Sequence, residues 1–378
     1  MTDHRVLHFL WDGTIGGAER ALYQVVRREL ALGEWDVGVA FGRAEGPYAD
    51  AVRSLGCEVL DLQMRSAADL PKALRQARRL RDYDIHHFHV MEPSQIAASA
   101  RCRGTTRVYT ERGGLDDAYV PRLKEARRAV GGMLLRHYFH GLAGNTRHAV
   151  NVAVKRYRLQ GLPTHVTYNG IDFSLLVPVR DRLEVRQELG IDSGALVVGS
   201  SGTFKSWKRF DRVVGLLGEM TGLHVLLVGD GGLRQELEQQ ARLLGAADRL
   251  HVTGLVGGVA DYLAAMDVFV LASSTAESFG NSVVESMALG IPSIVFSDSP
   301  GICEHIDDGV TGLIVDDQRG LAEAVQRLAD DPDLRSRLGE AGSAHVRSAY
   351  TLERMHDSYR RLYASALDYR AARAAGRI

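Results

Sequence analysis

Two glutamates, Glu277 and Glu285, are the residues whose type and spacing point most directly to chemistry. They stand eight positions apart, after an apolar run at 268–271 and at the beginning of a helical pattern. Carboxylates accept hydrogen bonds from hydroxyl groups, so Glu277 in the loop suits a sugar and Glu285 on the helix suits both hydroxyls of a ribose. Apolar surroundings make unpaired carboxylates costly, which disfavours two surface glutamates without a function.

The segment between the two glutamates also predicts a phosphate site. The helix is expected to begin near Gly280, and the first turn of a helix carries free N–H groups and the positive end of its dipole. We therefore expect a nucleotide diphosphate to lie here. The residues of this segment expected to contact it are Glu277, Ser278, Phe279, Gly280, Asn281, Ser282 and Glu285.

A glycine pair, Gly16 and Gly17, follows the predicted strand 6–11. Glycines let the backbone approach a ligand closely, and the helix that follows offers free N–H groups to phosphate. A tight turn between strand and helix, with no ligand, is the alternative. The spacing is not G-x-G-x-x-G, so the fingerprint of dinucleotide-binding proteins is absent.

With these motifs the sequence resembles glycosyltransferase family 4, whose signature is two glutamates separated by seven residues within a strand, loop and helix. The resemblance spans nearly the whole chain and includes segments 16–19, 169–172, 228–231 and 301–312. It implies the GT-B fold, with two facing Rossmann-like domains and a final helix that crosses back to the first. It also implies transfer from a nucleotide-diphosphate sugar with retention of anomeric configuration.

The resemblance assigns roles to further residues. It implies that Lys208 pairs with the donor diphosphate, where a cation stabilises the charge that grows on the leaving phosphate. A solvated lysine is the alternative. Relatives commonly carry an arginine five or six positions earlier, where this chain has Gly202 or Thr203, and Lys205 is a possible substitute. The expected catalytic residues are Lys208, Glu277 and Arg112, and the other expected donor contacts are Gly16, Gly17, Gly202, Thr203, Lys205, Gly229, Gly254 and Val256.

Arg112 departs from the family pattern, because many relatives have a histidine two residues after the threonine that is Thr110 here. An arginine cannot serve as a general base, but it donates a fork of hydrogen bonds to a hydroxyl, carboxylate or phosphate. The alternatives are a contact with sugar or phosphate and a structural ion pair with Glu111 or Asp116.

No metal or cofactor is expected, and the nucleotide sugar is a co-substrate. The D-x-D pattern at 82–84 precedes a predicted strand and the one at 331–333 lies in a helical connection, so neither suits a metal-dependent transferase. His86, His87 and His89 lie on or beside a predicted strand, with His87 and His89 on one face. Core histidines are favoured over a zinc site, which lacks further ligands.

The acceptor is the least determined part of the prediction. The chain up to residue 170 carries 25 Lys and Arg against 18 Asp and Glu, a balance of +7, and the remainder carries 21 against 29, a balance of −8. A basic stretch at 122–158 favours a lipid-linked glycan and peripheral contact with an anionic membrane. A solvated helix face with a small-molecule acceptor is the alternative, and no nucleic acid partner is expected.

Alternating apolar strands and amphipathic helices predict an α/β chain with two parallel sheets. We expect domains at 1–172 and 173–351 and a helix over 352–378. No run reaches the length needed to span a bilayer, which favours a cytoplasmic protein. An epimerase or phosphorylase of the same fold, a natural-product transferase and a non-catalytic sugar-nucleotide-binding subunit remain alternatives. The expected strands are 6–11, 37–41, 85–90, 107–110, 165–168, 196–200, 225–228, 250–253, 268–271, 293–296 and 312–315.

Overall fold

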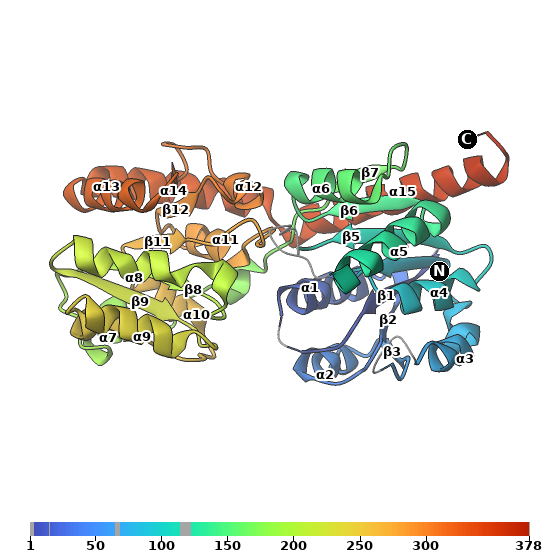
Figure 1. The fold of residues 1–378 in the computed structure, drawn as a ribbon, viewed down its shortest axis with the longest axis horizontal. Coiled ribbons are helices and arrows are strands. Elements are labelled where there is room, and N and C mark those ends of the chain that lie inside the picture. The colour runs from blue at the N-terminus through green and yellow to red at the C-terminus, as the bar shows by residue number, and fades with distance from the viewer. Residues whose placement is uncertain (1–3, 15, 65–68, 114–121, 378) are drawn as a thin grey trace. The chain divides into compact units, whose positions relative to one another are not determined.

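The computed structural model describes residues 4–14, 16–64, 69–113 and 122–377. The chain divides into two compact units (Figure 1). The first unit contains Met1–Gly170 and Leu352–Ile378, and the second contains Ile171–Thr351.

The first unit is built on a parallel sheet whose described strands have the order β3-β2-β1-β4-β5-β6-β7. Parallel neighbours need long crossover connections, and helices provide most of them. The strands are β1 (His4–Leu10), β2 (Trp35–Phe41), β3 (Glu58–Asp61), β4 (Ile85–Phe88), β5 (Thr106–Glu111), β6 (Gly141–Gly144) and β7 (Thr164–Val166). The helices are α1 (Gly17–Leu32), α2 (Pro47–Ser54), α3 (Leu70–Leu80), α4 (Pro93–Ala100), α5 (Arg122–Tyr138), α6 (Arg147–Tyr157) and α15 (Leu352–Ala374).

The second unit has a parallel sheet in the order β10-β9-β8-β11-β12-β13. Its strands are β8 (Leu196–Ser201), β9 (Leu223–Val228), β10 (Leu250–Val252), β11 (Val268–Leu271), β12 (Ser293–Phe296) and β13 (Leu313–Val315). Its α-helices are α7 (Arg182–Glu188), α8 (Phe210–Glu219), α9 (Arg234–Leu243), α10 (Val259–Ala264), α11 (Asn281–Ala288), α12 (Pro300–Cys303), α13 (Gln318–Asp330) and α14 (Pro332–Ala349).

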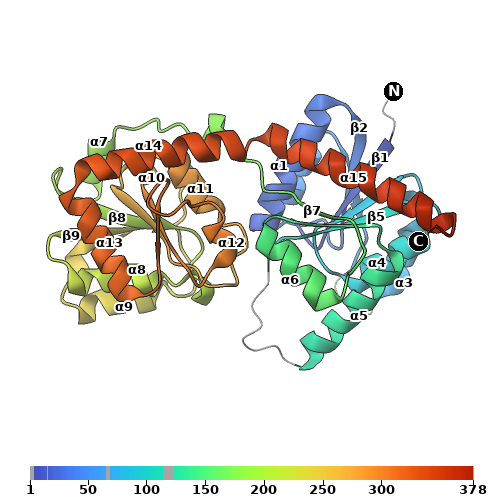
Figure 2. The same ribbon diagram turned by 90° about the horizontal axis from the view of Figure 1, so that it is seen from above.

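Helix α15 belongs to the first unit although it follows the second in sequence. It packs against β5, β6 and β7, and Figure 2 shows it crossing this sheet. The buried side chains of Met355, Tyr359, Leu362 and Tyr363 form one hydrophobic cluster with residues of the sheet and α1. The amphipathic pattern of this segment therefore reflects a buried face that closes the first unit.

The expected strands and the parallel α/β architecture are confirmed, with strand ends displaced by at most two residues. Two strands, β3 and β6, were not expected from the sequence. Among the described residues, no helix combines the length and apolar composition that a membrane crossing requires.

Candidate active site

An ion pair between Lys208 and Glu277 lies at the centre of the candidate site in the second unit. The Nζ of Lys208 is 2.5 Å from Oε2 of Glu277, and the two side chains are 16% and 17% exposed. Lys208 ends a short 3-10 turn after β8, whereas Glu277 lies in the loop after the neighbouring strand β11. Adjacent parallel strands end at the same edge of a sheet, which is why these distant residues meet. Lys208 is therefore not the solvated lysine of the alternative reading.

The loop that carries Glu277 is held by several hydrogen bonds. The amide of Ser274 donates to the carbonyl of Trp207 over 2.8 Å, which links this loop to the turn before Lys208. The hydroxyl of Ser273 donates to Oε2 of Glu277 over 3.4 Å. These contacts fix the carboxylate relative to the lysine.

His305 forms a hydrogen bond with the same loop, and it was not among the site residues predicted from the sequence. Its Nε2 lies 2.6 Å from the carbonyl oxygen of Phe279, and its Nδ1 lies 2.8 Å from the hydroxyl of Tyr350. Burial lowers the pKa of His305 to about 4, so the ring is neutral near pH 7. The carbonyl can only accept, so the hydrogen-bond network assigns the proton to Nε2.

Helix α11 begins beside this loop, as the sequence predicts. Its N-cap, Gly280, has φ of 67°, and a Cβ there would lie 2.7 Å from Cδ2 of Leu271. The hydroxyl of Ser282 is buried and has no hydrogen-bond partner within the described part of the chain. Glu285 is 2% exposed on the same helix. The helix start thus combines the positive end of the helix dipole, a buried hydroxyl and a nearby carboxylate.

Three glycines bring backbone segments together at the same edge of the second sheet. Gly229 has φ of 139°, and a Cβ on it would lie 2.1 Å from the carbonyl oxygen of Gly202. Gly254 has φ of 71° and forms a β-bridge with Gly229. A Cβ on Gly202 would lie 3.6 Å from Cε of Lys208, so the glycine cluster adjoins the lysine.

The remaining donor-site residues expected from the sequence lie farther from the ion pair or in the other unit. Lys205 and Thr203 are exposed, and the Nζ of Lys205 lies 4.9 Å from the centre of the Trp207 ring. Val256 is half-buried in the loop after β10. Gly16 and Gly17 belong to the first unit, where Gly16 is the N-cap of α1, and their contact with a donor stays a prediction.

Arg112 lies directly after β5 in the first unit and is half-buried. Its Nε donates to Nδ1 of His89 over 2.9 Å, Nη1 donates to Oδ1 of Asn169 over 2.9 Å, and Nη2 donates to the hydroxyl of Tyr359 over 2.7 Å. The suggested ion pair with Glu111 is wrong, and Asp116 lies outside the described residues.

Glu111 is directed elsewhere in the first unit, which explains why it does not pair with the neighbouring arginine. It accepts hydrogen bonds from the hydroxyl of Tyr109 over 3.1 Å and from the amide of Gly113 over 3.3 Å. Burial raises the pKa of Glu111. The guanidinium of Arg112 is therefore held by neutral acceptors.

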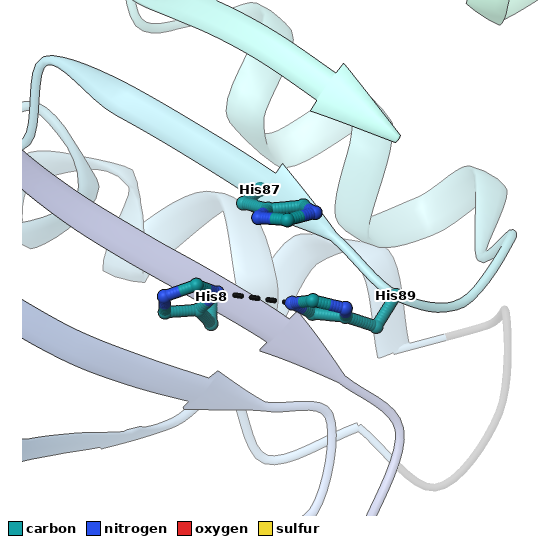
Figure 3. A group of neighbouring side chains, drawn as sticks. All are labelled: His8, His87 and His89. Carbon is teal, nitrogen blue, oxygen red and sulfur yellow. Dashed lines mark hydrogen bonds between the residues drawn. The ribbon is translucent and has the colours of Figure 1, made fainter. Parts of the chain in front are cut away.

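The histidines expected on one strand face do lie together, and His8 from β1 joins His87 and His89 (Figure 3). One nitrogen from each ring lies within 4.8 Å of the others, which is close enough to consider a metal ion. However, both nitrogens of His87 contact hydroxyl groups, and a metal on Nε2 of His89 would move that ring's proton onto Nδ1, against the N–H of Arg112. The described hydrogen bonds thus fit core histidines better than metal ligands.

The basic stretch of the first unit is only partly described. The side chains of residues 122–128 lie outside the described part, although α5 includes their backbone. Arg136, Lys155 and Arg158 are exposed. Contact of this surface with a membrane stays a prediction.

Comparisons with known proteins bear on the family and the fold. The profile of the family described as Glycosyl transferases group 1 matches residues 181–345, and that of Glycosyltransferase Family 4 matches residues 15–175. The lipopolysaccharide core biosynthesis glycosyltransferase LpsE of Rhizobium meliloti is 36% identical over 182 residues, which cover 48% of this chain and 53% of LpsE. The chain spans about half the length of the first curated relatives it matches. A D-inositol 3-phosphate glycosyltransferase of Actinosynnema mirum is 30% identical over 313 residues, which cover 76% of this chain and 73% of the relative.

Solved structures share the fold at low sequence identity. The UDP complex of Anabaena Alr3699/HepE has a TM-score of 0.84 at 20% identity and covers 96% of this chain and 100% of its own. A glycosyltransferase from Rickettsia africae has a TM-score of 0.82 at 15% identity, with coverage of 97% and 99%. The chain therefore has the GT-B fold and belongs to glycosyltransferase family 4.

Proposed function

We propose that this protein is a retaining glycosyltransferase that moves a hexosyl group from a UDP- or GDP-sugar to an acceptor hydroxyl. The observation that carries the proposal is the Lys208–Glu277 ion pair at the sheet edge where α11 begins. The cation and the helix N-terminus suit the diphosphate of a nucleotide sugar, and the carboxylate suits the hydroxyls of its sugar.

Each part of the donor has a complementary group in the second unit. Glu285 is assigned to the ribose hydroxyls, and the positive end of α11 suits the diphosphate, with the buried hydroxyl of Ser282 on the first turn. Glu277 suits the hydroxyls of the transferred sugar. Lys208 is then the cation that neutralises the leaving diphosphate.

In the proposed reaction, the bond between the anomeric carbon and the diphosphate oxygen breaks while the acceptor oxygen attacks from the same face. A phosphate oxygen of the leaving group takes the acceptor proton, so no protein nucleophile is required. The protein contributes position and charge stabilisation. No metal is expected in this scheme, and transfer should persist in excess EDTA.

The acceptor is proposed to be a lipid-linked glycan in polysaccharide or glycolipid assembly. LpsE is named for lipopolysaccharide core biosynthesis, and the exposed basic side chains of the first unit suit an anionic surface. Sedimentation with vesicles tests the membrane part. Equal recovery of the protein with anionic and neutral vesicles would contradict the proposed membrane contact.

Calorimetry with UDP-, GDP-, ADP- and TDP-sugars tests the proposal as a whole. We expect one nucleotide sugar to bind selectively to the wild type and both Glu285→Ala and Lys208→Ala to weaken that binding. Release of product that contains both sugar and acceptor, and retention of configuration by NMR, would separate transfer from epimerisation. Absence of binding to every nucleotide sugar would overturn the proposal.

A further inference from the structure

A buried chain of hydrogen bonds connects Arg112 to a carboxylate in α1. The Nε of Arg112 lies 2.9 Å from Nδ1 of His89, Nε2 of His89 lies 2.9 Å from Nδ1 of His8, and Nε2 of His8 lies 2.8 Å from Oε2 of Glu29. His8, His89 and Glu29 are 0%, 3% and 1% exposed. Residues of α1 and β1, together with the residues that directly follow β4 and β5, thus form one hydrogen-bonded chain inside the first unit.

The two ends of this chain are compatible with one set of proton positions. Starting from Arg112, whose Nε–H can only donate, His89 accepts at Nδ1 and as a neutral ring carries its proton on Nε2. His89 then donates from Nε2 to Nδ1 of His8. His8 in turn donates from Nε2 to the carboxylate of Glu29, which can only accept. Burial and the charge of Arg112 keep the pKa of His89 well below its ordinary value, so the ring stays a neutral acceptor.

This arrangement separates Arg112 from its counter-ion, Glu29, by two histidine rings. A carboxylate in direct contact would occupy two N–H groups of the guanidinium fork. Here, three of the five N–H groups contact His89, Asn169 and Tyr359. The other two have no partner among the described residues, and Arg112 lies at the carboxyl edge of the first sheet, where ligands bind in such folds.

We propose that Glu29, His8 and His89 are positioning residues that hold Arg112 as an oxyanion-binding group, with Glu29 as its internal counter-ion. The inference rests on the proposed transferase function, because the oxyanion belongs to the donor or the acceptor. Its chemical class is a phosphate or a carboxylate, which two parallel N–H groups of a guanidinium recognise.

The proton positions give a test that does not depend on activity. In protein labelled with ¹⁵N-histidine, ring nitrogen shifts at pH 7 should show His8 and His89 protonated on Nε2 alone. Arg112→Ala should release this constraint and shift the ring nitrogens of His89. A proton on Nδ1 of His89 in the wild type, or an unchanged spectrum in Arg112→Ala, would overturn the proposal.

A double-variant cycle tests the link to the reaction, with UDP-glucose as the donor and release of UDP as the signal. We expect Glu29→Gln to lower kcat/KM about 10- to 100-fold, by analogy with the loss that follows removal of an outer hydrogen-bond partner from a metal-binding histidine. In the Arg112→Ala background it should cause no further loss. If the double variant loses the product of the two single-variant losses in kcat/KM, Glu29 does not act through Arg112.

Glu34→Gln is the matched control, because Glu34 also contacts a buried histidine of the first unit, His356, over 3.1 Å, outside the chain. It should leave kcat/KM unchanged, and an equal loss would contradict the proposal. If UDP-glucose yields no UDP but GDP-glucose does, the cycle is run with that donor. If the wild-type protein uses neither, the cycle is run with the nucleotide sugar that calorimetry selects. If calorimetry finds no nucleotide sugar that binds, the proposed function fails, and the nitrogen shifts alone decide whether the chain of hydrogen bonds exists.

Discussion

Lys208 and Glu277 neutralise each other across the ends of two adjacent strands, with Nζ and Oε2 2.5 Å apart. A bound diphosphate would compete with the carboxylate for the ammonium, since both are oxyanions. In the proposed reaction the pair keeps the lysine in place before a donor binds, and the lysine is therefore the first residue to test.

Lys208→Ala is expected to lower kcat about 10²- to 10³-fold, the usual effect of removing one charge-stabilising group from a transition state. Steady-state kinetics with saturating donor measures it. Lys205→Ala is the control, because Lys205 is exposed and rests on Trp207. Equal losses in the two variants would contradict the assignment of Lys208.

Glu285→Gln and Glu277→Gln should separate the two halves of the donor. Because Glu285 is assigned to the ribose, its substitution should weaken UDP and UDP-glucose equally, by about 10- to 100-fold for a lost hydrogen bond to a charged group. Glu277→Gln should weaken UDP-glucose and spare UDP. Calorimetry measures both, with the exposed Glu323→Gln on α13 as a control. The reverse pattern would exchange the two assignments.

Gly229→Ala is expected to destabilise the second unit by about 1–3 kcal/mol, because φ of 139° and the approach to Gly202 both oppose a Cβ. Gly232→Ala, three residues later, meets nothing within 4 Å and should change the free energy of unfolding little. Urea unfolding of the two variants gives the comparison. Similar midpoints would show that the backbone relaxes around Gly229.

His305 should make the stability of the second unit depend on pH. Its folded-state pKa is about 4 against 6.5 in the unfolded chain, so the unfolded state binds more protons between these values. The free energy of unfolding should therefore fall as pH drops from 6.5 to 4, by up to about 3 kcal/mol for this difference in pKa.

Urea unfolding at several pH values measures this effect, and His305→Gln should flatten the dependence. The exposed His137, which lies in the other unit, provides a control substitution that should leave it unchanged. An identical pH profile for His305→Gln would show that His305 is not the group responsible.

The sequence predicted the sheets well because most strands are short apolar runs with β-branched residues. Strand β6 was not predicted because its residues, Gly141 to Gly144, have little preference for extended structure. A Cβ on Gly141 would lie 3.2 Å from Cβ of Ala366, so the small residue is explained by α15 packing across it. Such a requirement arises from a segment far away in sequence and leaves no local pattern.

The candidate site likewise contains residues that could be predicted from the sequence and residues that could not. Glu277 and Glu285 belong to one continuous segment, so their spacing could be recognised. The partners of Arg112 could not, because Tyr359 is 247 positions away and His89 is 23 positions away. Glu29 resembles any other helix glutamate until β1 places His8 beside it.

The packing of α15 onto the first unit sets an order for folding during synthesis. Domains usually fold in the order in which the ribosome releases them. Here, Tyr359 and Tyr363 complete the core of the first unit, yet all of Ile171–Thr351 is translated before them. The second unit can finish its core while the first still exposes the sheet face that α15 will cover.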